Sequence, residues 1–146
     1  MSGTKPENVF IASVHAHLPP PSKLYRMKLN NSYLSGPADN WYSGSGHGSK
    51  DLWIEWKFIV VPKRDSTMID INAGKKPALS ALQRDWLAER HAEGRNIWVG
   101  IGSEKGGVIL EHLSWLQPMS AKDFRAAMMK RKQLAEYIAA FVQGSG

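Results

Sequence analysis

Residues 51–57, DLWIEWK, alternate polar and apolar side chains, and the polar positions carry two carboxylates and an amine. This alternation is typical of a β-strand with one buried face. Side chains two positions apart on a strand share a face and lie roughly 7 Å apart at the backbone, so Glu55 and Lys57 can converge on one small ligand. The opposite face is apolar, and we expect it to pack against a helix. The strand therefore predicts either a solvated face with a cross-strand salt bridge or a functional site.

The segments before this strand predict a helix and two further strands. Apolar residues recur at helical spacing over residues 7–18, and three prolines at 19–21 end the helix. Residues 23–33 and 40–44 read as strands, and the glycine-rich stretch 44–50 predicts a hairpin loop into the quoted strand. The apolar residues 58–61 extend that strand, and a polar connection follows over 62–78.

The second half of the chain predicts a helix, two strands and a final helix. The stretch 79–95 has Ser80 as N-cap and Gly94 as terminator, with one stripe formed by Leu79, Leu82, Trp86 and Arg90. Residues 96–102 read as a buried strand, 106–113 as its hairpin partner, and about 120–142 as an amphipathic helix that Ser120 opens. Because a strand, a helix and a strand in succession require a parallel crossover, we expect an α/β fold with a mixed sheet.

Composition limits the class of protein. The 146 residues suit one domain spanning 1–146, and the net charge of +6 favours polyanionic partners such as nucleic acid. The absence of cysteine excludes disulfides and thiolate metal sites. No apolar run approaches the roughly 20 residues of a transmembrane helix, and the first ten residues lack a signal-peptide pattern. We therefore expect a cytoplasmic protein.

A second carboxylate stands upstream, at Asp39 within SGPADNWYSG (residues 35–44). A hairpin would bring it beside Glu55. Carboxylate oxygens hold Mg²⁺ or Mn²⁺, such a metal lowers the pKa of a bound water, and an ammonium such as that of Lys57 steadies charge on a phosphate. This combination predicts phosphodiester hydrolysis.

An aspartate, a gap, and then Glu-x-Lys on a strand followed by a helix and a strand resembles the PD-(D/E)xK nuclease superfamily. Within it, residues 35–44, 51–57, 79–102 and 106–110 together resemble the small, often phage-encoded, stand-alone virus-type replication-repair nuclease (VRR-NUC) domain, over about residues 5–118. The resemblance implies a restriction-endonuclease-like core, a mixed β-sheet flanked by helices, with the helix at about 120–142 added to it.

The resemblance also implies roles for individual residues. Asp39 and Glu55 match the metal ligands, Lys57 the catalytic lysine, Gln83 a glutamine of the site, and Glu7 a further metal-binding carboxylate. The motif proline directly before the aspartate is Ala38 here, with Pro37 one residue earlier, so Asp51 remains the alternative first ligand. Glu7 and Gln83 each stand three residues after a Thr or Ser, Thr4 and Ser80 respectively, so each could instead complete a capping box.

Basic residues offer candidate contacts to a phosphate backbone. Lys23, Arg26 and Lys28 are interleaved with aromatic residues before the candidate site, and further lysines and arginines lie along the last helix. That helix predicts packing on the domain, a subunit contact or a DNA-binding face.

The sequence thus predicts an Mg²⁺- or Mn²⁺-dependent DNA endonuclease. Because small stand-alone domains of this type resemble junction-resolving enzymes, the expected substrate is branched DNA such as a four-way (Holliday) junction, and the expected assembly is a homodimer, which supplies two sites. Two alternatives remain: a nuclease of the same fold that acts on linear or single-stranded nucleic acid, and a basic nucleic-acid-binding module without catalysis.

Overall fold

The computed structural model describes residues 5–28 and 38–144 of the chain. Its elements, in chain order, are α1 (Pro6–His15), β1 (Leu24–Lys28), β2 (Asn40–Gly44), β3 (Asp51–Phe58), β4 (Met68–Ile69), α2 (Ala81–Ala92), β5 (Ile97–Ser103), β6 (Gly106–Glu111), the 3₁₀ turn η1 (Ser114–Leu116), β7 (Met119–Ser120), α3 (Ala121–Ala127) and α4 (Arg131–Val142). The part of the predicted strand 23–33 that follows Lys28 lies outside the described residues.

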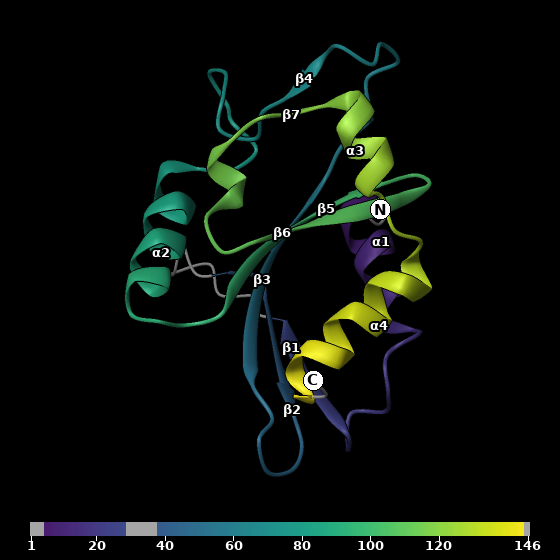
Figure 1. Cartoon of the computed structure of the whole chain (residues 1–146), viewed down its shortest axis with the longest axis vertical. Helices are drawn as coiled ribbons and strands as arrows, with labels where there is room; N and C mark the ends of the chain where they lie inside the picture. The colour runs from purple at the N-terminus through teal and green to yellow at the C-terminus, as the bar shows by residue number, and fades with distance from the viewer. Residues whose placement is uncertain (1–4, 29–37, 145–146) are drawn as a thin grey trace.

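A mixed five-stranded sheet forms the centre of the fold, in the order β1-β2-β3-β5-β6. Strand β3 pairs parallel to β5, with Glu55 opposite Val99, and all other neighbours in this sheet pair antiparallel. The parallel pair flanks α2 in the sequence, as the predicted crossover requires. Figure 1 shows α2 on one side of the sheet and α1 and α4 on the other.

The apolar face of β3 packs on helices, as expected. Ile54 and Trp56 are fully buried in one core with Phe10 of α1 and Ile138 of α4. The opposite face of the sheet contributes Val99 and other residues to a second core, which includes Leu87 of α2. The sheet is therefore covered on both faces, and β5, central in it, is buried along its whole length.

The prediction of one helix over residues 120–142 is wrong. Ser120 does cap α3, but the chain then extends, and Met129 exchanges two backbone hydrogen bonds with Gly107 of β6, 2.8 and 2.9 Å long. Helix α4 begins only after this bridge, at Arg131. The amphipathic pattern could not reveal the break because it is caused by pairing with a distant strand edge.

Two further boundaries differ from the prediction. Strand β3 ends at Phe58 rather than Val61, and after it Ile59 donates a last backbone hydrogen bond to Gly102. The connection over 62–78 is not wholly irregular, because β4 pairs antiparallel with β7 in a separate two-stranded sheet. A two-residue strand has no periodicity that a sequence could show.

Helix α2 agrees with its predicted ends but not with its predicted apolar stripe. Ser80 is the N-cap and Gly94 adopts a positive φ of 82° after the helix. Leu82, assigned to the stripe, is 56% exposed, whereas Leu87 is fully buried. Leu79 and Trp86 of the predicted stripe do face the protein, so the difference lies at Leu82, whose place on the buried side is taken by Gln83 and Leu87.

No helix of the described residues is long and apolar enough to cross a membrane.

Candidate active site

Glu55 and Lys57 form a largely buried ion pair on the polar face of β3. The Glu55 side chain is 1% exposed and that of Lys57 is 16% exposed, and Lys57 Nζ lies 3.3 Å from Glu55 Oε2. Leaving a charge this deeply buried without a partner would be costly, so the pair must be held together. The alternative of a solvent-exposed polar face is therefore wrong for Glu55, which is buried.

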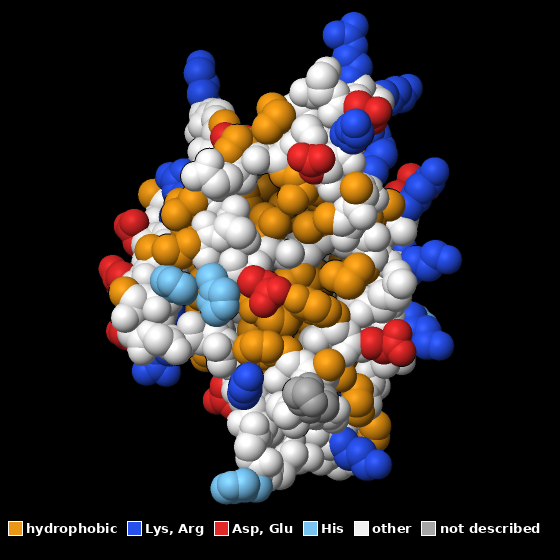
Figure 2. All heavy atoms as spheres, viewed as in Figure 1, with side chains coloured by type: hydrophobic (Ala, Val, Ile, Leu, Met, Phe, Trp, Pro, Cys, Tyr) orange, Lys and Arg blue, Asp and Glu red, His pale blue; other side chains and the backbone are white. Residues whose placement is uncertain are grey.

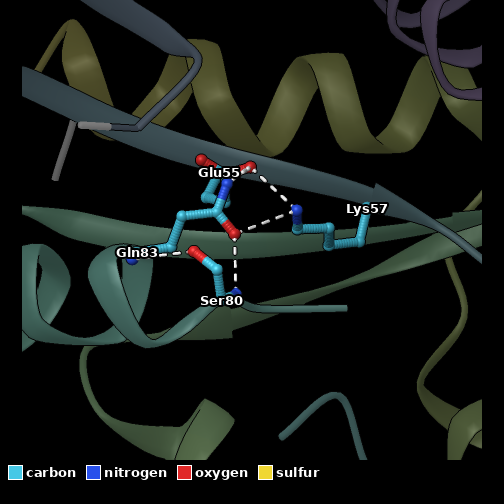
Figure 3. Close-up of polar contacts among 4 residues, drawn as sticks. All are labelled: Glu55, Lys57, Ser80 and Gln83. Carbon is cyan, nitrogen blue, oxygen red and sulfur yellow. Dashed lines mark hydrogen bonds and ion pairs between the residues drawn. The ribbon is translucent and has the colours of Figure 1, made fainter. Parts of the chain in front are cut away.

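Gln83 closes the arrangement from the first turn of α2 (Figure 3). Its Nε2 donates to Glu55 Oε2 at 3.3 Å, and its Oε1 accepts from Lys57 Nζ at 3.2 Å. The same Oε1 accepts from the Ser80 backbone N–H at 3.0 Å, while Ser80 Oγ accepts from the Gln83 N–H at 3.1 Å. The capping role and the site role predicted for Gln83 thus coincide, because its one amide caps the helix and contacts both Glu55 and Lys57.

Ser80 therefore influences the site, although the sequence identified it only as a cap. The capping box fixes which way the Gln83 amide points, with its oxygen toward Lys57 and its nitrogen toward Glu55. The signal in the sequence is the serine three residues before the glutamine, but the contact with β3 depends on where α2 docks.

Asp39, rather than Asp51, lies close enough to act on Glu55. Asn40 pairs with Ile54, so Asp39 stands beside Glu55 at the entrance of β2, and its charge contributes to the pKa of Glu55. Asp51 is exposed at the far end of β3, where it accepts a hydrogen bond from Ser43 Oγ at 2.8 Å. The geometry therefore favours Asp39 of the two candidates.

The pKa of Glu55 is raised to about 8, first because the carboxyl is desolvated and second because Asp39 repels it, while Lys57 opposes both effects. When both carboxyls are ionised neither can donate, and Glu55 Oε1 is then buried without a hydrogen-bond partner. Protonation of one would allow a hydrogen bond between Asp39 and Glu55, which adds to the upward shift. Two ionised carboxylates beside one ammonium therefore carry excess negative charge that a proton or a cation relieves.

Glu7 lies in the first turn of α1, half-buried. Burial raises its pKa, Lys57 lowers it and Asp39 raises it, so it faces the same charges as Glu55. The N-cap of α1 is Lys5, which places Glu7 at the second helical position rather than in a capping box with Thr4, itself outside the described residues. The capping role is therefore not supported for Glu7, and its role as a metal ligand stays a prediction.

The basic residues of β1 are directed elsewhere. Arg26 pairs with Tyr42, on the face of the sheet that α1 covers, and its Nη1 donates to the Pro19 carbonyl at 2.6 Å. Lys28 shares that face and donates to Asn8 Oδ1 of α1 at 2.8 Å. Lys23 is exposed just before the strand. None of the three forms a hydrogen bond or ion pair with Glu55 or Lys57 among the described residues, although the charge of Lys28 lowers the pKa of Glu7.

Comparison with known proteins supports the fold assignment. The chain is similar to the Holliday junction resolvase Hjc of Archaeoglobus fulgidus, an archaeal hyperthermophile, with a TM-score of 0.52, 15% sequence identity, and coverage of 94% of this chain and 99% of that chain. The chain has the restriction-endonuclease-like fold. No protein-family model matches it, and no curated protein matches its sequence, so its relation to the VRR-NUC family remains a prediction.

Nucleases of this fold imply a divalent cation, and the donors present fit one. Asp39 and Glu55 offer hard oxygen ligands, and the unpartnered Oε1 of Glu55 together with the repulsion between the two carboxyls marks where positive charge is missing. Within 5–28 and 38–144, no group of three His, Asp or Glu side chains could hold a metal ion. Two carboxylates suffice for Mg²⁺, which usually keeps several waters and binds substrate phosphates.

Proposed function

We propose that this protein is a metal-dependent DNA endonuclease with its active site at Glu55, Lys57, Gln83 and Asp39. The observation that carries the proposal is the buried Glu55–Lys57–Gln83 contact set beside a second carboxylate, on a fold that resembles a junction resolvase. A buried ion pair is a poor means of stabilising a fold, because the cost of desolvation offsets the attraction. The position of the Glu55–Lys57 pair on the sheet, next to Asp39, is better explained by a catalytic role.

Asp39 and Glu55 would hold Mg²⁺ or Mn²⁺, and Glu7, whose pKa is raised by the charge of Asp39, would add negative charge to their surroundings. When bound, the cation would supply an electrophilic centre that stabilises charge on the phosphate and acidifies water. Lys57 Nζ, now shared between Glu55 and Gln83, would steady the negative charge that develops on the phosphate. Gln83 would orient Lys57 and the attacking water. Attack in line would leave 5′-phosphate and 3′-hydroxyl ends, as the superfamily resemblance implies.

The proposed substrate is branched DNA, such as a four-way junction. The observation that supports it is the similarity to an archaeal Holliday junction resolvase. Symmetric cleavage of a junction requires two active sites, so the proposal includes a homodimer.

The test is cleavage of a labelled four-way junction beside linear duplex and single strand, in Mg²⁺, Mn²⁺ or EDTA. We expect paired, metal-dependent nicks near the branch point. Glu55→Gln and Asp39→Asn should each lower the cleavage rate by at least about 10²-fold, because each removes charge at the point where a cation and the phosphate meet.

Asp51→Asn is the matched control, since it neutralises an exposed carboxylate on the same strand, four residues from Glu55. It should leave cleavage unchanged, and loss of cleavage in this variant would reassign the first ligand. Cleavage of linear or single-stranded substrate in preference to the junction would support the same chemistry on another substrate. Tight binding without cleavage in any metal would instead identify a nucleic-acid-binding module.

A further inference from the structure

A row of aromatic side chains crosses the sheet next to the candidate active site. Trp86 of α2 contacts Trp53 of β3, Trp53 contacts Trp41 of β2, and Trp41 contacts Tyr25 of β1, with ring centroids 5.4, 6.3 and 5.4 Å apart. We call these four residues the aromatic row. The rings meet at angles between 40° and 71°, the tilted and edge-on arrangements that aromatic pairs prefer.

The aromatic row lies on the same face of the sheet as Glu55. Trp53 stands two residues before Glu55 on β3, and Trp41 stands two residues after Asp39, so each ring shares a face with its neighbouring carboxylate. Trp86 stands three residues after Gln83 on α2, one helical turn away. The row therefore runs beside the line of Asp39, Glu55 and Gln83, roughly 7 Å from it along the strands.

Packing of the core does not account for the exposed end of the row. Trp53 and Trp86 border the core beneath α2, whereas Tyr25 and Trp41 belong to neither core of the described residues. Tyr25 is 52% exposed, and Met27, which is paired with Trp41 on the same face, is 40% exposed. Single exposed apolar residues are ordinary, but a contiguous aromatic surface beside a polar site indicates binding.

At the other end of the row the Arg90 guanidinium lies 5.7 Å from the Trp86 ring, where it also forms an ion pair with Glu93 at 2.8 Å. Aromatic faces with nearby cations are the features on which proteins stack unpaired bases, since every base has a π-face and each stacked base is accompanied by a phosphate. Paired bases inside a duplex cannot reach such a surface. The occupant that matches this chemistry and this position is a DNA strand with unpaired bases.

We propose, on the basis of the nuclease function above, that the aromatic row stacks the unpaired nucleobases adjacent to the phosphodiester held at Asp39 and Glu55. The row then selects DNA in which bases are exposed, such as a branch point that is opened so that its bases are unpaired, over continuous duplex. Recognition of this kind depends on DNA structure and is tolerant of sequence.

The experiment measures binding in EDTA, where no cleavage occurs, to two DNAs of equal length: one with a branch that leaves bases unpaired and one continuous duplex. Tyr25→Ala and Trp41→Leu should each weaken binding to the branched DNA about tenfold and leave duplex binding unchanged. Tyr25→Phe keeps the ring and should bind as the wild type does. Thermal unfolding of each variant verifies that the fold is intact.

Tyr137→Ala is the matched control. Tyr137 is a partly exposed tyrosine, 39%, on α4, and it packs on Trp98, which faces the core on the opposite side of the sheet. Equal losses for branched and duplex DNA, no loss in Tyr25→Ala and Trp41→Leu, or a similar loss in Tyr137→Ala would each overturn the proposal. The two proposals fail separately. If the wild type never cleaves DNA but the row variants lose binding to branched DNA selectively, the aromatic row is supported and the nuclease function is not. If the wild type cleaves and the row variants bind normally, only the catalytic site is supported.

Discussion

At the level of single residues, the Gln83 amide joins the start of a helix to the candidate site. Its oxygen is shared by the Ser80 N–H and the Lys57 ammonium, and its nitrogen reaches Glu55. An amide can rotate freely on an exposed helix, but here the capping box restricts it. Helix capping therefore contributes to the geometry of the site as well as to the stability of α2.

Ser80→Ala tests this connection. Loss of the Oγ acceptor should lower the free energy of unfolding by about 1 kcal/mol, and the loosened first turn of α2, which moves the Ser80 backbone N–H relative to the Gln83 amide, should lower the cleavage rate by about tenfold. Ser120→Ala removes the same kind of cap from α3, where Ser120 Oγ accepts from the Asp123 N–H at 3.0 Å. Denaturant unfolding and cleavage kinetics measure the two effects. If both variants lose stability alike and neither loses activity, Gln83 is held by its contacts with β3 alone.

A second residue-level feature is a buried chain of hydrogen bonds between α1 and the sheet. Trp56 Nε1 donates to Tyr42 Oη at 3.0 Å, which leaves the Tyr42 hydroxyl proton to be donated to His15 Nε2 at 2.7 Å. Burial and the charges of Arg26 and Lys28 lower the pKa of His15 to about 4. The folded protein therefore holds this histidine neutral.

Stability should consequently depend on pH through His15. Between about pH 6.5 and pH 4 the unfolded chain binds a proton that the folded chain does not, so stability is complete above this window and is lost as the pH falls through it. His15→Phe should flatten the dependence of unfolding free energy on pH in that window. His17→Gln, at an exposed position two residues later, is the control and should keep the wild-type slope. Identical slopes in all three proteins would exclude His15 as the titrating group.

At the level of elements, the close approach of α1 to the sheet depends on small residues in β5. A Cβ at Gly102 would stand 2.6 Å from the Phe10 ring, and one at Gly100 would stand 2.4 Å from the Trp56 ring. Both aromatic side chains are almost wholly buried. The glycines of β5 thus make room for aromatic residues of α1 and β3, and α1 carries Glu7 toward the site.

Gly102→Ala should therefore overpack this contact and lower the free energy of unfolding by about 1–3 kcal/mol. In a Phe10→Leu background the same substitution should cost less, because the smaller side chain leaves space for the new methyl group. Urea unfolding of the four proteins in this cycle, with unchanged m-values, measures the coupling. Additive losses would show that the methyl group does not meet Phe10.

At the level of the whole molecule, hydrophobic side chains gather over the centre of one face, where an acidic side chain also lies, and charged side chains of both signs project around its margin (Figure 2). Strand β6, at one edge of the main sheet, carries the Met129 bridge at Gly107. An apolar centre within a charged rim is the arrangement expected of a surface that meets another protein. It is consistent with the proposed homodimer.

The dimer can be tested directly. Sedimentation equilibrium at micromolar concentration should give twice the 16.3 kDa of the chain, and the two nicks in a four-way junction should be related by symmetry. A mass of one chain at all concentrations, with single nicks placed independently, would contradict the dimer and leave the catalytic proposal intact.

The sequence by itself determined the central crossover of the main sheet, and it predicted the residues that the structure brings together around Glu55. Alternation in residues 51–57, a capped helix and a buried strand predict the β3–α2–β5 crossover, because both periodicities are local properties of the chain. The expectation that Asp39 would adjoin Glu55 followed from a hairpin between neighbouring strands, and β2 and β3 do pair in this way.

The tertiary structure decided the features that depend on contacts between distant segments. The break between α3 and α4 follows from pairing of Met129 with Gly107, and β4 exists because it pairs with β7, some fifty residues away. Likewise, only the register of three strands and the docking of α2 show that Tyr25, Trp41, Trp53 and Trp86 form one row. Periodicity indicates which face of a helix or strand is apolar. It does not indicate which other segment of the chain packs against that face, because that segment lies far away in the sequence.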